Sequence, residues 1–263
     1  MKRTGAAIML TTAVLAAMPV NATELKVISA GAVRGVVEGM IDDYSKRTGI
    51  KFNFTTGPTG LLRDTISSGA PADLIIASAP LMAELEATGK MLPGSRVDLG
   101  RLGLGLVVRV GAAAPDVSTP EALKQTLLKA QSIAHTDPKL GGTSVIHLMK
   151  IADGFGIGGD VRKKSVTATG GNDAVTKVAK GEAEIAIVLV SEIHDKGAKL
   201  VAMLPEPLQL WTVYSAAIPS NSTDPKNARA FVDALTSPAL RPRWIEAGWQ
   251  PSRELIAPLR ARH

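Results

Sequence analysis

The 263-residue chain contains no cysteine and few aromatic residues, and each absence excludes a class of chemistry. Without cysteine there is no thiol nucleophile, no disulfide bond and no cysteine-ligated zinc site. Aromatic residues make up only 3% of the chain, and lysines and arginines form no long run, so the sequence does not suggest a nucleic-acid partner. The scarcity of aromatic rings also requires a core built from Ala, Val, Leu and Ile.

Long apolar runs are also scarce, and the one that is prominent lies at the N-terminus. It covers residues 6–20, follows the basic Met1-Lys2-Arg3, and leads into Val20-Asn21-Ala22, which has the small residues of a cleavage site. This arrangement is typical of a secretory signal peptide and is short for a membrane span. We therefore predict that residues 1–22 are a cleaved signal peptide rather than a buried helix. The mature protein, residues 23–263, is then periplasmic and not inserted in the membrane.

Recognisable catalytic and metal-binding motifs are missing as well. The sequence has no phosphate-binding P-loop, no nucleophile elbow with Asp and His partners, and no cluster spaced to hold a metal. We therefore predict no metal and no cofactor. The full chain carries a net charge of +6, and this mild excess suits a small anionic ligand through electrostatic steering.

Short apolar runs alternate with helical patterns, and this alternation predicts an α/β fold. Residues 25–29 and 72–77 are apolar runs typical of buried strands, and residues 51–55 alternate as a strand does. Between them, apolar residues recur at helical spacing over residues 33–44, and Gly49 ends that helix. Strands that alternate with helices predict a mostly parallel sheet covered by helices on both faces.

Two extended apolar segments divide this pattern into two lobes. We predict that residues 104–110 and 211–218 are hinge strands on which the chain crosses between the lobes. Lobe 1 is then formed by residues 23–103 and 219–263, and lobe 2 by residues 104–218, which include both crossing strands. The prediction is a monomer with two α/β lobes and a ligand cleft between them.

Four loops rich in Gly, Ser and Thr each follow a predicted strand and open a predicted helix. They are Ser29-Ala30-Gly31-Ala32, Gly57-Pro58-Thr59-Gly60, Leu140-Gly141-Gly142-Thr143-Ser144 and Thr169-Gly170-Gly171-Asn172. A helix N-terminus offers unpaired backbone N–H groups and the positive end of the helix dipole, so these loops predict a bound anion. The predicted ligand-binding residues in them are Ser29, Gly31, Thr59, Thr143, Ser144, Gly171 and Asn172. Thr143 and Ser144 also suit plain helix caps, and Gly171 an ordinary turn.

Three basic residues stand near these loops and suit a carboxylate ligand. Arg34 and Arg63 each lie one turn into a predicted helix, and Lys139 precedes the third loop. Arginine can bind a carboxylate through two parallel hydrogen bonds. If at least two of the three face the cleft, the ligand is an organic di- or tricarboxylate. The alternative for each is a solvated position on the surface.

His135 stands at the end of a predicted buried strand, directly before Thr136-Asp137-Pro138. In open α/β sheets, ligands bind beyond the carboxyl ends of the strands. His135 is therefore a candidate acid or base that titrates near neutral pH. The alternative is a histidine whose ring is satisfied by nearby backbone groups.

Four segments occur in a recognisable order along the mature chain. They are Leu25-Lys26-Val27-Ile28-Ser29-Ala30-Gly31, Gly57-Pro58-Thr59-Gly60-Leu61, Ser68-Gly69-Ala70-Pro71-Ala72-Asp73-Leu74-Ile75-Ile76-Ala77 and Val178-Ala179-Lys180-Gly181-Glu182-Ala183-Glu184-Ile185-Ala186-Ile187-Val188. In this order the chain resembles the type II periplasmic solute-binding proteins, and among them the molybdate-binding-protein-like family of ABC importers. The resemblance covers nearly the whole mature chain. It implies a two-lobed periplasmic-binding-protein type II fold, a small anionic ligand and delivery to an ABC permease.

The predicted loops depart from the molybdate-binding pattern of that family. Where the family presents two serines after the first strand, this chain has Ser29 followed by Ala30, and Thr59 stands in place of a serine. Leu189 stands where the family has a tyrosine. A desolvated tetrahedral oxyanion needs a donor for nearly every oxygen. The missing hydroxyls therefore argue against molybdate or tungstate as the ligand.

Two functions remain open for such a protein. The first, which the fold class favours, is an exported solute-binding protein of an ABC importer that binds an organic carboxylate. The second is an aconitate isomerase, because a branch that resembles this family interconverts trans- and cis-aconitate by moving an allylic proton. For an isomerase, His135 is the predicted acid/base residue, and Arg34, Arg63 and Lys139 are the predicted carboxylate clamps.

Overall fold

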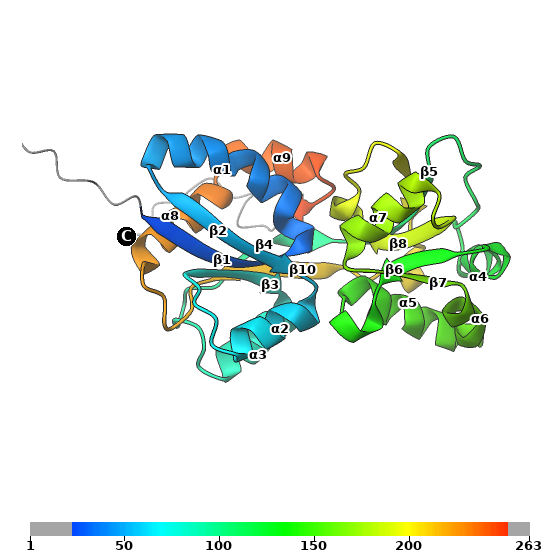
Figure 1. The fold of residues 1–263 in the computed structure, drawn as a ribbon, viewed down its shortest axis with the longest axis horizontal. Coiled ribbons are helices and arrows are strands. Elements are labelled where there is room, and N and C mark those ends of the chain that lie inside the picture. The colour runs from blue at the N-terminus through cyan, green and yellow to red at the C-terminus, as the bar shows by residue number, and fades with distance from the viewer. Residues whose placement is uncertain (1–22, 252–263) are drawn as a thin grey trace, which may run out of the picture.

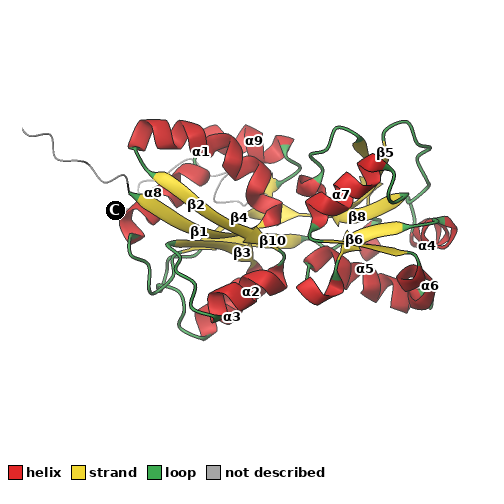
Figure 2. Cartoon of the chain, viewed as in Figure 1, coloured by secondary structure: helices red, strands yellow, loops and turns green. Residues whose placement is uncertain are grey.

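The computed structural model describes residues 23–251, which form two lobes side by side (Figure 1). Each lobe is a β-sheet with helices on both faces (Figure 2). The sheet of lobe 1 has the strand order β11-β4-β10-β3-β1-β2, and that of lobe 2 the order β7-β6-β8-β5-β9. The predicted two-lobed α/β fold is thereby confirmed. The predicted signal peptide, residues 1–22, lies outside the described residues.

In lobe 1, β1 (Glu24–Ala30) lies between β2 (Lys51–Gly57) and β3 (Leu74–Ser78) and runs parallel to both. All of β3 is buried, because helices cover both faces of this sheet (Figure 1). The helices of the lobe are η1 (Gly31–Val33), α1 (Arg34–Thr48), α2 (Thr59–Ser67), α3 (Ala79–Ala87), α8 (Pro225–Leu235), η5 (Pro238–Leu240) and α9 (Arg241–Glu246). Tyr44, Phe52 and Phe231 pack edge to face or tilted between α1, β2 and α8, so much of the scarce aromatic surface lies in this core.

Lobe 2 repeats the same layered plan with five strands. β6 (Ile133–Thr136) runs parallel to its neighbours β7 (Ser165–Ala168) and β8 (Ile185–Leu189), and β5 (Leu104–Arg109) pairs antiparallel with β8 and β9 (Ala198–Met203). Its helices are α4 (Pro120–Lys129), η2 (Pro138–Leu140), α5 (Thr143–Gly154), α6 (Gly158–Lys163), α7 (Gly171–Lys180), η3 (Val190–Glu192) and η4 (Glu206–Leu208). Leu and Val side chains of β5 and β8 are almost fully buried, and each contributes about 1.5–3 kcal/mol to stability.

The chain crosses between the lobes at two adjacent places. It leaves lobe 1 at Gly103, between β4 (Val97–Leu102) and β5, and returns after β9 through the segment that contains Gln209. The side chain of Gln209 joins the two crossings, because its Oε1 accepts from Leu104 N at 2.8 Å and its Nε2 donates to Leu104 O at 3.0 Å. A Cβ on Gly103 would lie 2.4 Å from the Met203 side chain, so the crossings are closely packed.

Two details of the prediction differ from the structure. β10 (Thr212–Ala217) was predicted to be a crossing strand of lobe 2, but it pairs antiparallel with β3 and β4 inside lobe 1. Both sheets are also mixed rather than mostly parallel: β10 and β11 (Gln250–Pro251) form antiparallel pairs in lobe 1, and β5 forms them in lobe 2. The apolar pattern of a buried strand does not reveal its partner, because any interior strand of either sheet has the same pattern.

The buried carboxylate of Asp73 explains part of the Ser68–Ala77 motif. It lies before β3 and accepts hydrogen bonds from Lys26 N at 3.0 Å and from Thr223 N at 2.9 Å, with further donors from Ser222 and Asp224. Burial alone raises the pKa of Asp73, but these hydrogen bonds together hold it below its ordinary value. Asp73 thus ties the start of β3 to the loop before α8, which is a structural role. None of the helices described is long and apolar enough to cross a membrane.

Candidate functional site

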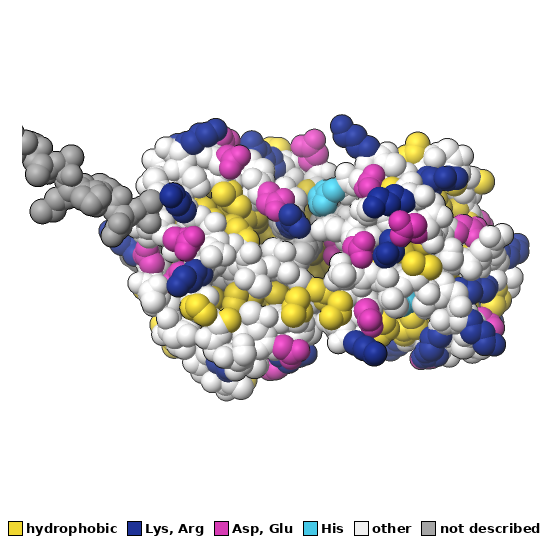
Figure 3. Space-filling view, in the orientation of Figure 1, with side chains coloured by type: hydrophobic (Ala, Val, Ile, Leu, Met, Phe, Trp, Pro, Cys, Tyr) yellow, Lys and Arg dark blue, Asp and Glu magenta, His cyan; other side chains and the backbone are white. Residues whose placement is uncertain are grey.

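A hollow of about 280 Å³ lies between the two lobes, and residues from both lobes line it. In the space-filling view the lobes are in contact along this junction (Figure 3). The volume is slightly below the usual range for small-molecule pockets, so the hollow suits a small ligand. We call it the cleft.

Four helices begin at the cleft, and they begin at the four loops singled out in the sequence. Gly31 opens η1, Thr59 opens α2, Thr143 opens α5 and Gly171 opens α7, and all four residues line the cleft. None of these N-termini has a side-chain cap. A bound anion can therefore accept hydrogen bonds from first-turn N–H groups that no side chain satisfies.

Helices α4 and α8, which begin away from the cleft, have N-cap residues whose side chains do bond to the first turn. The Thr119 side chain accepts from Ala122 N at 3.1 Å, and the Asp224 side chain accepts from Asn227 N at 3.1 Å. These caps satisfy donors that the cleft helices leave open. Because α3, α6 and α9 also begin without a side-chain cap and do not line the cleft, what distinguishes the cleft is that four uncapped ends meet there.

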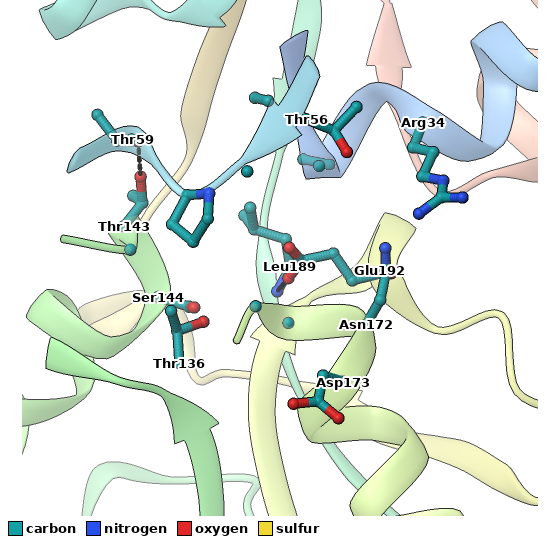
Figure 4. Close-up of a pocket in the computed structure, with 18 of the residues that line it drawn as sticks. Arg34, Thr56, Thr59, Thr136, Thr143, Ser144, Asn172, Asp173, Leu189 and Glu192 are labelled. Carbon is teal, nitrogen blue, oxygen red and sulfur yellow. Dashed lines mark hydrogen bonds between the residues drawn. The ribbon is translucent and has the colours of Figure 1, made fainter. Parts of the chain in front are cut away.

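Hydroxyl groups from the two lobes meet across the cleft. Thr59 Oγ1 of lobe 1 lies 3.5 Å from Thr143 Oγ1 of lobe 2, and either can be the donor (Figure 4). The Thr143 side chain also lies near the phenol of Tyr214, which belongs to lobe 1, and partly offsets the rise in the pKa of that phenol. Thr143 is therefore close to two residues of the opposite lobe.

Glu192 ends η3, and its side chain reaches into the cleft beside Leu189 (Figure 4). It is 9% exposed and packs against the backbone of Gly171, where a Cβ would lie 1.9 Å from Glu192 Oε2. Leu189 N donates to the same oxygen at 3.1 Å. Within residues 23–251 no lysine or arginine forms an ion pair with Glu192.

The burial of this carboxyl group governs its acidity. Desolvation raises the pKa of Glu192 to about 7, and the hydrogen bond from Leu189 offsets only part of that effect. The pKa of Tyr214 is raised too, first by desolvation and then by the nearby charge of Glu192. The cleft thus contains a carboxyl group that can lose and regain a proton near neutral pH, which is the property of a general acid or base.

Tyr214 lines the cleft from β10. Beside it the pairing of β10 with β4 shifts register, because Tyr214 pairs with Gly100 and Ser215 with Asp98, which leaves Leu99 of β4 as an extra residue. The Tyr214 ring packs edge to face on Trp249 at 5.5 Å, and Trp249 packs on Trp244 at 4.8 Å. The phenol is therefore held by an aromatic stack from the C-terminal part of lobe 1.

Most of the predicted site residues are brought together, but of the three basic ones only Arg34 lines the cleft. Gly31, Arg34, Thr59, Thr143, Ser144, Gly171 and Asn172 line the cleft. Arg34 is about half exposed and its Nε lies 2.6 Å from Glu38 Oε1. Arg63 pairs with Glu84 at 3.0 Å and Lys139 is exposed, and neither lines the cleft. Ser29 is buried and donates to the Ala30 carbonyl at 3.2 Å.

His135 does not face the cleft. Its Nδ1 lies 2.8 Å from the Thr136 carbonyl and its Nε2 lies 2.7 Å from Ser165 Oγ. The ring borders a separate groove formed by α5, α6 and β7. Successive residues of a strand point to opposite faces, and it is Thr136, not His135, that lines the cleft. Both ring nitrogens of His135 therefore have hydrogen-bond partners within lobe 2, which agrees with the alternative interpretation of this residue.

Sequence reasoning missed several residues of the cleft, of which Glu192 and Tyr214 matter most for its chemistry. Glu192 follows the apolar strand β8 directly, and a charged residue at the carboxyl end of a buried strand was a usable signal. Tyr214 gave no such signal, because it lies within an apolar strand whose partners, β3 and β4, are distant in the sequence. Asn172 was identified from its loop, and its Oδ1 is buried with no hydrogen-bond partner, so a ligand group can pair with it.

Comparison with known proteins places this chain among solute-binding proteins. A family model described as bacterial extracellular solute-binding protein matches residues 25–250. An aconitate isomerase of Pseudomonas sp is 32% identical over 94% of this chain and 94% of its own length. A molybdate-binding protein of Azotobacter vinelandii is 27% identical over 85% of this chain and 88% of its own length.

Solved structures support the same fold. A periplasmic molybdate-binding protein of Azotobacter vinelandii superimposes with a TM-score of 0.70 and 22% sequence identity. The match covers 87% of this chain and 99% of that chain. At this level of identity the likeness concerns the arrangement of the lobes and not the ligand.

Proposed function

The chain belongs to the family of bacterial extracellular solute-binding proteins, and on that premise we propose that it is an isomerase of aconitate. In this proposal the cleft binds trans- or cis-aconitate and moves one allylic proton. The single observation that carries the proposal is Glu192, a buried carboxyl group in the cleft with a pKa raised to about 7. The likeness to an aconitate isomerase over 94% of both chains supports it.

The reaction needs one group that takes a proton and returns it. Glu192, as the carboxylate, removes a proton from the CH2 carbon of aconitate, and the electron pair spreads over the allylic system into the adjoining carboxylate. Glu192, now the acid, returns the proton to the former alkene carbon, and the double bond shifts. No atom or electron is gained or lost overall, so the reaction needs no redox partner. A pKa near the working pH suits both half-steps.

The uncapped helix ends supply what the developing charge requires. Backbone N–H groups at Gly31, Thr59, Thr143 and Gly171 are fixed in position, and fixed donors stabilise an enolate-like charge without reorganisation. Arg34 is the one lysine or arginine among the described residues that line the cleft. We propose that Arg34 binds a carboxylate of the ligand. To do so it would release its exposed partner Glu38.

Two features weigh against a tetrahedral oxyanion as the ligand. Leu189, at the position where the molybdate binders have a tyrosine, lines the cleft and offers no hydroxyl. Glu192 would place a carboxyl group beside a tetrahedral dianion, which has an oxygen on every side and no C–H group to turn toward it, so that carboxyl group would have to stay protonated to avoid repulsion. An organic acid can place its carboxylates at the helix ends and a CH2 group near Glu192, and it therefore fits this arrangement of donors and carboxyl group better.

The test is turnover of trans-aconitate by residues 23–263, followed by proton NMR in deuterated buffer. We expect conversion to the cis isomer, and a loss of at least about 100-fold in kcat for Glu192→Gln, which keeps the shape but cannot take a proton. His135→Ala is the control, because His135 faces away from the cleft. Equal turnover by Glu192→Gln and the unaltered protein would refute the role of Glu192.

A second function is a transport component, because the family consists of solute-binding proteins. In that case the protein is a periplasmic monomer that binds an organic carboxylate in the cleft and delivers it to an ABC permease. The same NMR sample distinguishes the two: line broadening or shifts of trans-aconitate without any cis product indicate a binder. Binding of molybdate with no effect of aconitate would contradict both functions.

A further inference from the structure

Two glycines from opposite lobes meet backbone to backbone at the edge of the cleft. Gly60 is the second residue of α2 in lobe 1, and Gly141 lies between η2 and α5 in lobe 2. A Cβ added to Gly60 would lie 2.5 Å from the carbonyl oxygen of Leu140 and 3.3 Å from the Cα of Gly141. Real Cβ atoms do not approach backbone so closely. The lobes therefore fit together here because residue 60 has no side chain.

The backbone of Gly60 itself does not require glycine. Its φ is not positive, unlike that of Gly141 at +67°, and it lies within a helix. Alanine forms helices more readily than glycine. The reason for glycine at position 60 is thus the contact with lobe 2, whereas Gly141 is also required by its own conformation.

This glycine contact adjoins the hydroxyl bridge between the lobes. Thr59 precedes Gly60, and its hydroxyl lies 3.5 Å from that of Thr143 (Figure 4). Any atom that separated α2 from η2 at Gly60 would also separate the hydroxyls of Thr59 and Thr143. The distance between the two uncapped helix ends, those of α2 and α5, would grow with it.

We propose that Gly60 is a specificity-determining residue, whose missing side chain sets the width of the closed cleft and thereby the size of the ligand. With glycine at position 60, the helix ends of both lobes reach a ligand that fits the cleft volume of about 280 Å³. With alanine, the lobes stop short of this position, and a small polycarboxylate is contacted by only one lobe at a time. The identity of that ligand rests on the proposed function, but the steric stop does not.

The chain contains no cysteine, so an engineered pair reports closure without background. Thr59→Cys with Thr143→Cys places two thiols where the hydroxyls lie 3.5 Å apart, and mild oxidation links them only when the lobes are closed. We expect Gly60→Ala to slow this cross-link by about tenfold or more. Gly159→Ala is the matched control, because Gly159 is the second residue of α6 and a Cβ there meets nothing within 4 Å.

Two measurements separate this proposal from the proposed function. In the protein without cysteines, Gly60→Ala should weaken binding of trans-aconitate by about tenfold while Gly159→Ala leaves it unchanged. If the cysteine pair does not cross-link, or cross-links equally fast with Gly60→Ala, the steric stop at Gly60 is refuted. If the cross-link slows as expected but no variant binds trans-aconitate, the ligand is wrong and the role of Gly60 stands.

Discussion

Replacing Glu192 by glutamine should stabilise the protein at alkaline pH and leave it unchanged at acid pH. Burial raises the pKa of Glu192 from 4.5 in the unfolded chain to about 7 in the fold. Below pH 4.5 both states hold the proton, so burial of the neutral acid carries no electrostatic penalty. As pH rises toward 7 the unfolded state alone releases its proton, and the free energy of unfolding falls. Above 7 the loss is complete, at about 3 kcal/mol.

Glutamine has no proton to lose, so Glu192→Gln should be more stable than the unaltered protein by about 3 kcal/mol at about pH 8 and equal to it near pH 4. Urea unfolding followed by fluorescence of the buried Trp244 and Trp249 measures the difference. The other titratable groups are the same in both proteins, so their contributions to the difference in the free energy of unfolding cancel. Glu206→Gln, at an exposed position, should show no pH-dependent difference. A constant difference between Glu192→Gln and the unaltered protein across this pH range would refute the argument.

Three further substitutions test other parts of the molecule. Asp73→Asn should lower the free energy of unfolding by about 2 kcal/mol at neutral pH in urea titrations. Because the pKa of Asp73 is lowered, that difference should shrink as the pH falls and the native carboxylate is protonated. His135→Ala should lower the melting temperature, since the hydrogen bond to Ser165 is lost, yet leave aconitate turnover unchanged in the NMR assay. Arg34→Ala should weaken binding of trans-aconitate about tenfold by calorimetry, whereas Arg63→Ala, whose partner is the exposed Glu84, should not.

The four cleft loops could be predicted because their signals are local. A glycine, serine or threonine after an apolar run and before a helical pattern marks a strand-to-helix turn wherever the chain folds. Parallel strands bring such turns to one edge of a sheet. Residues of all four loops, such as Gly31, Thr59, Thr143 and Asn172, therefore come together in the cleft. The two lobes followed from the same pattern and from the family resemblance.

What could not be predicted depends on partners distant in the sequence. Which face of β6 borders the cleft decides between His135 and Thr136, and one strand in isolation does not contain that information. The position of Tyr214 depends on the pairing of β10 with β3 and β4, which are distant from it in the sequence. The environments of Arg63 and Lys139 depend on neighbours that helix spacing does not identify.

Glu192 also bears on why this cleft differs from a simple anion receptor. A protein that only binds and releases a carboxylate gains nothing from a buried acid, because glutamine would fill the same space against Gly171 and accept from Leu189. Glutamate at this position lowers stability at neutral pH by about the amount worked out above, and it opposes an anionic ligand whenever it is ionised. Proteins retain such unfavourable groups mainly where chemistry needs them. A carboxyl group that exchanges its proton near pH 7 is therefore better explained by proton transfer than by binding alone.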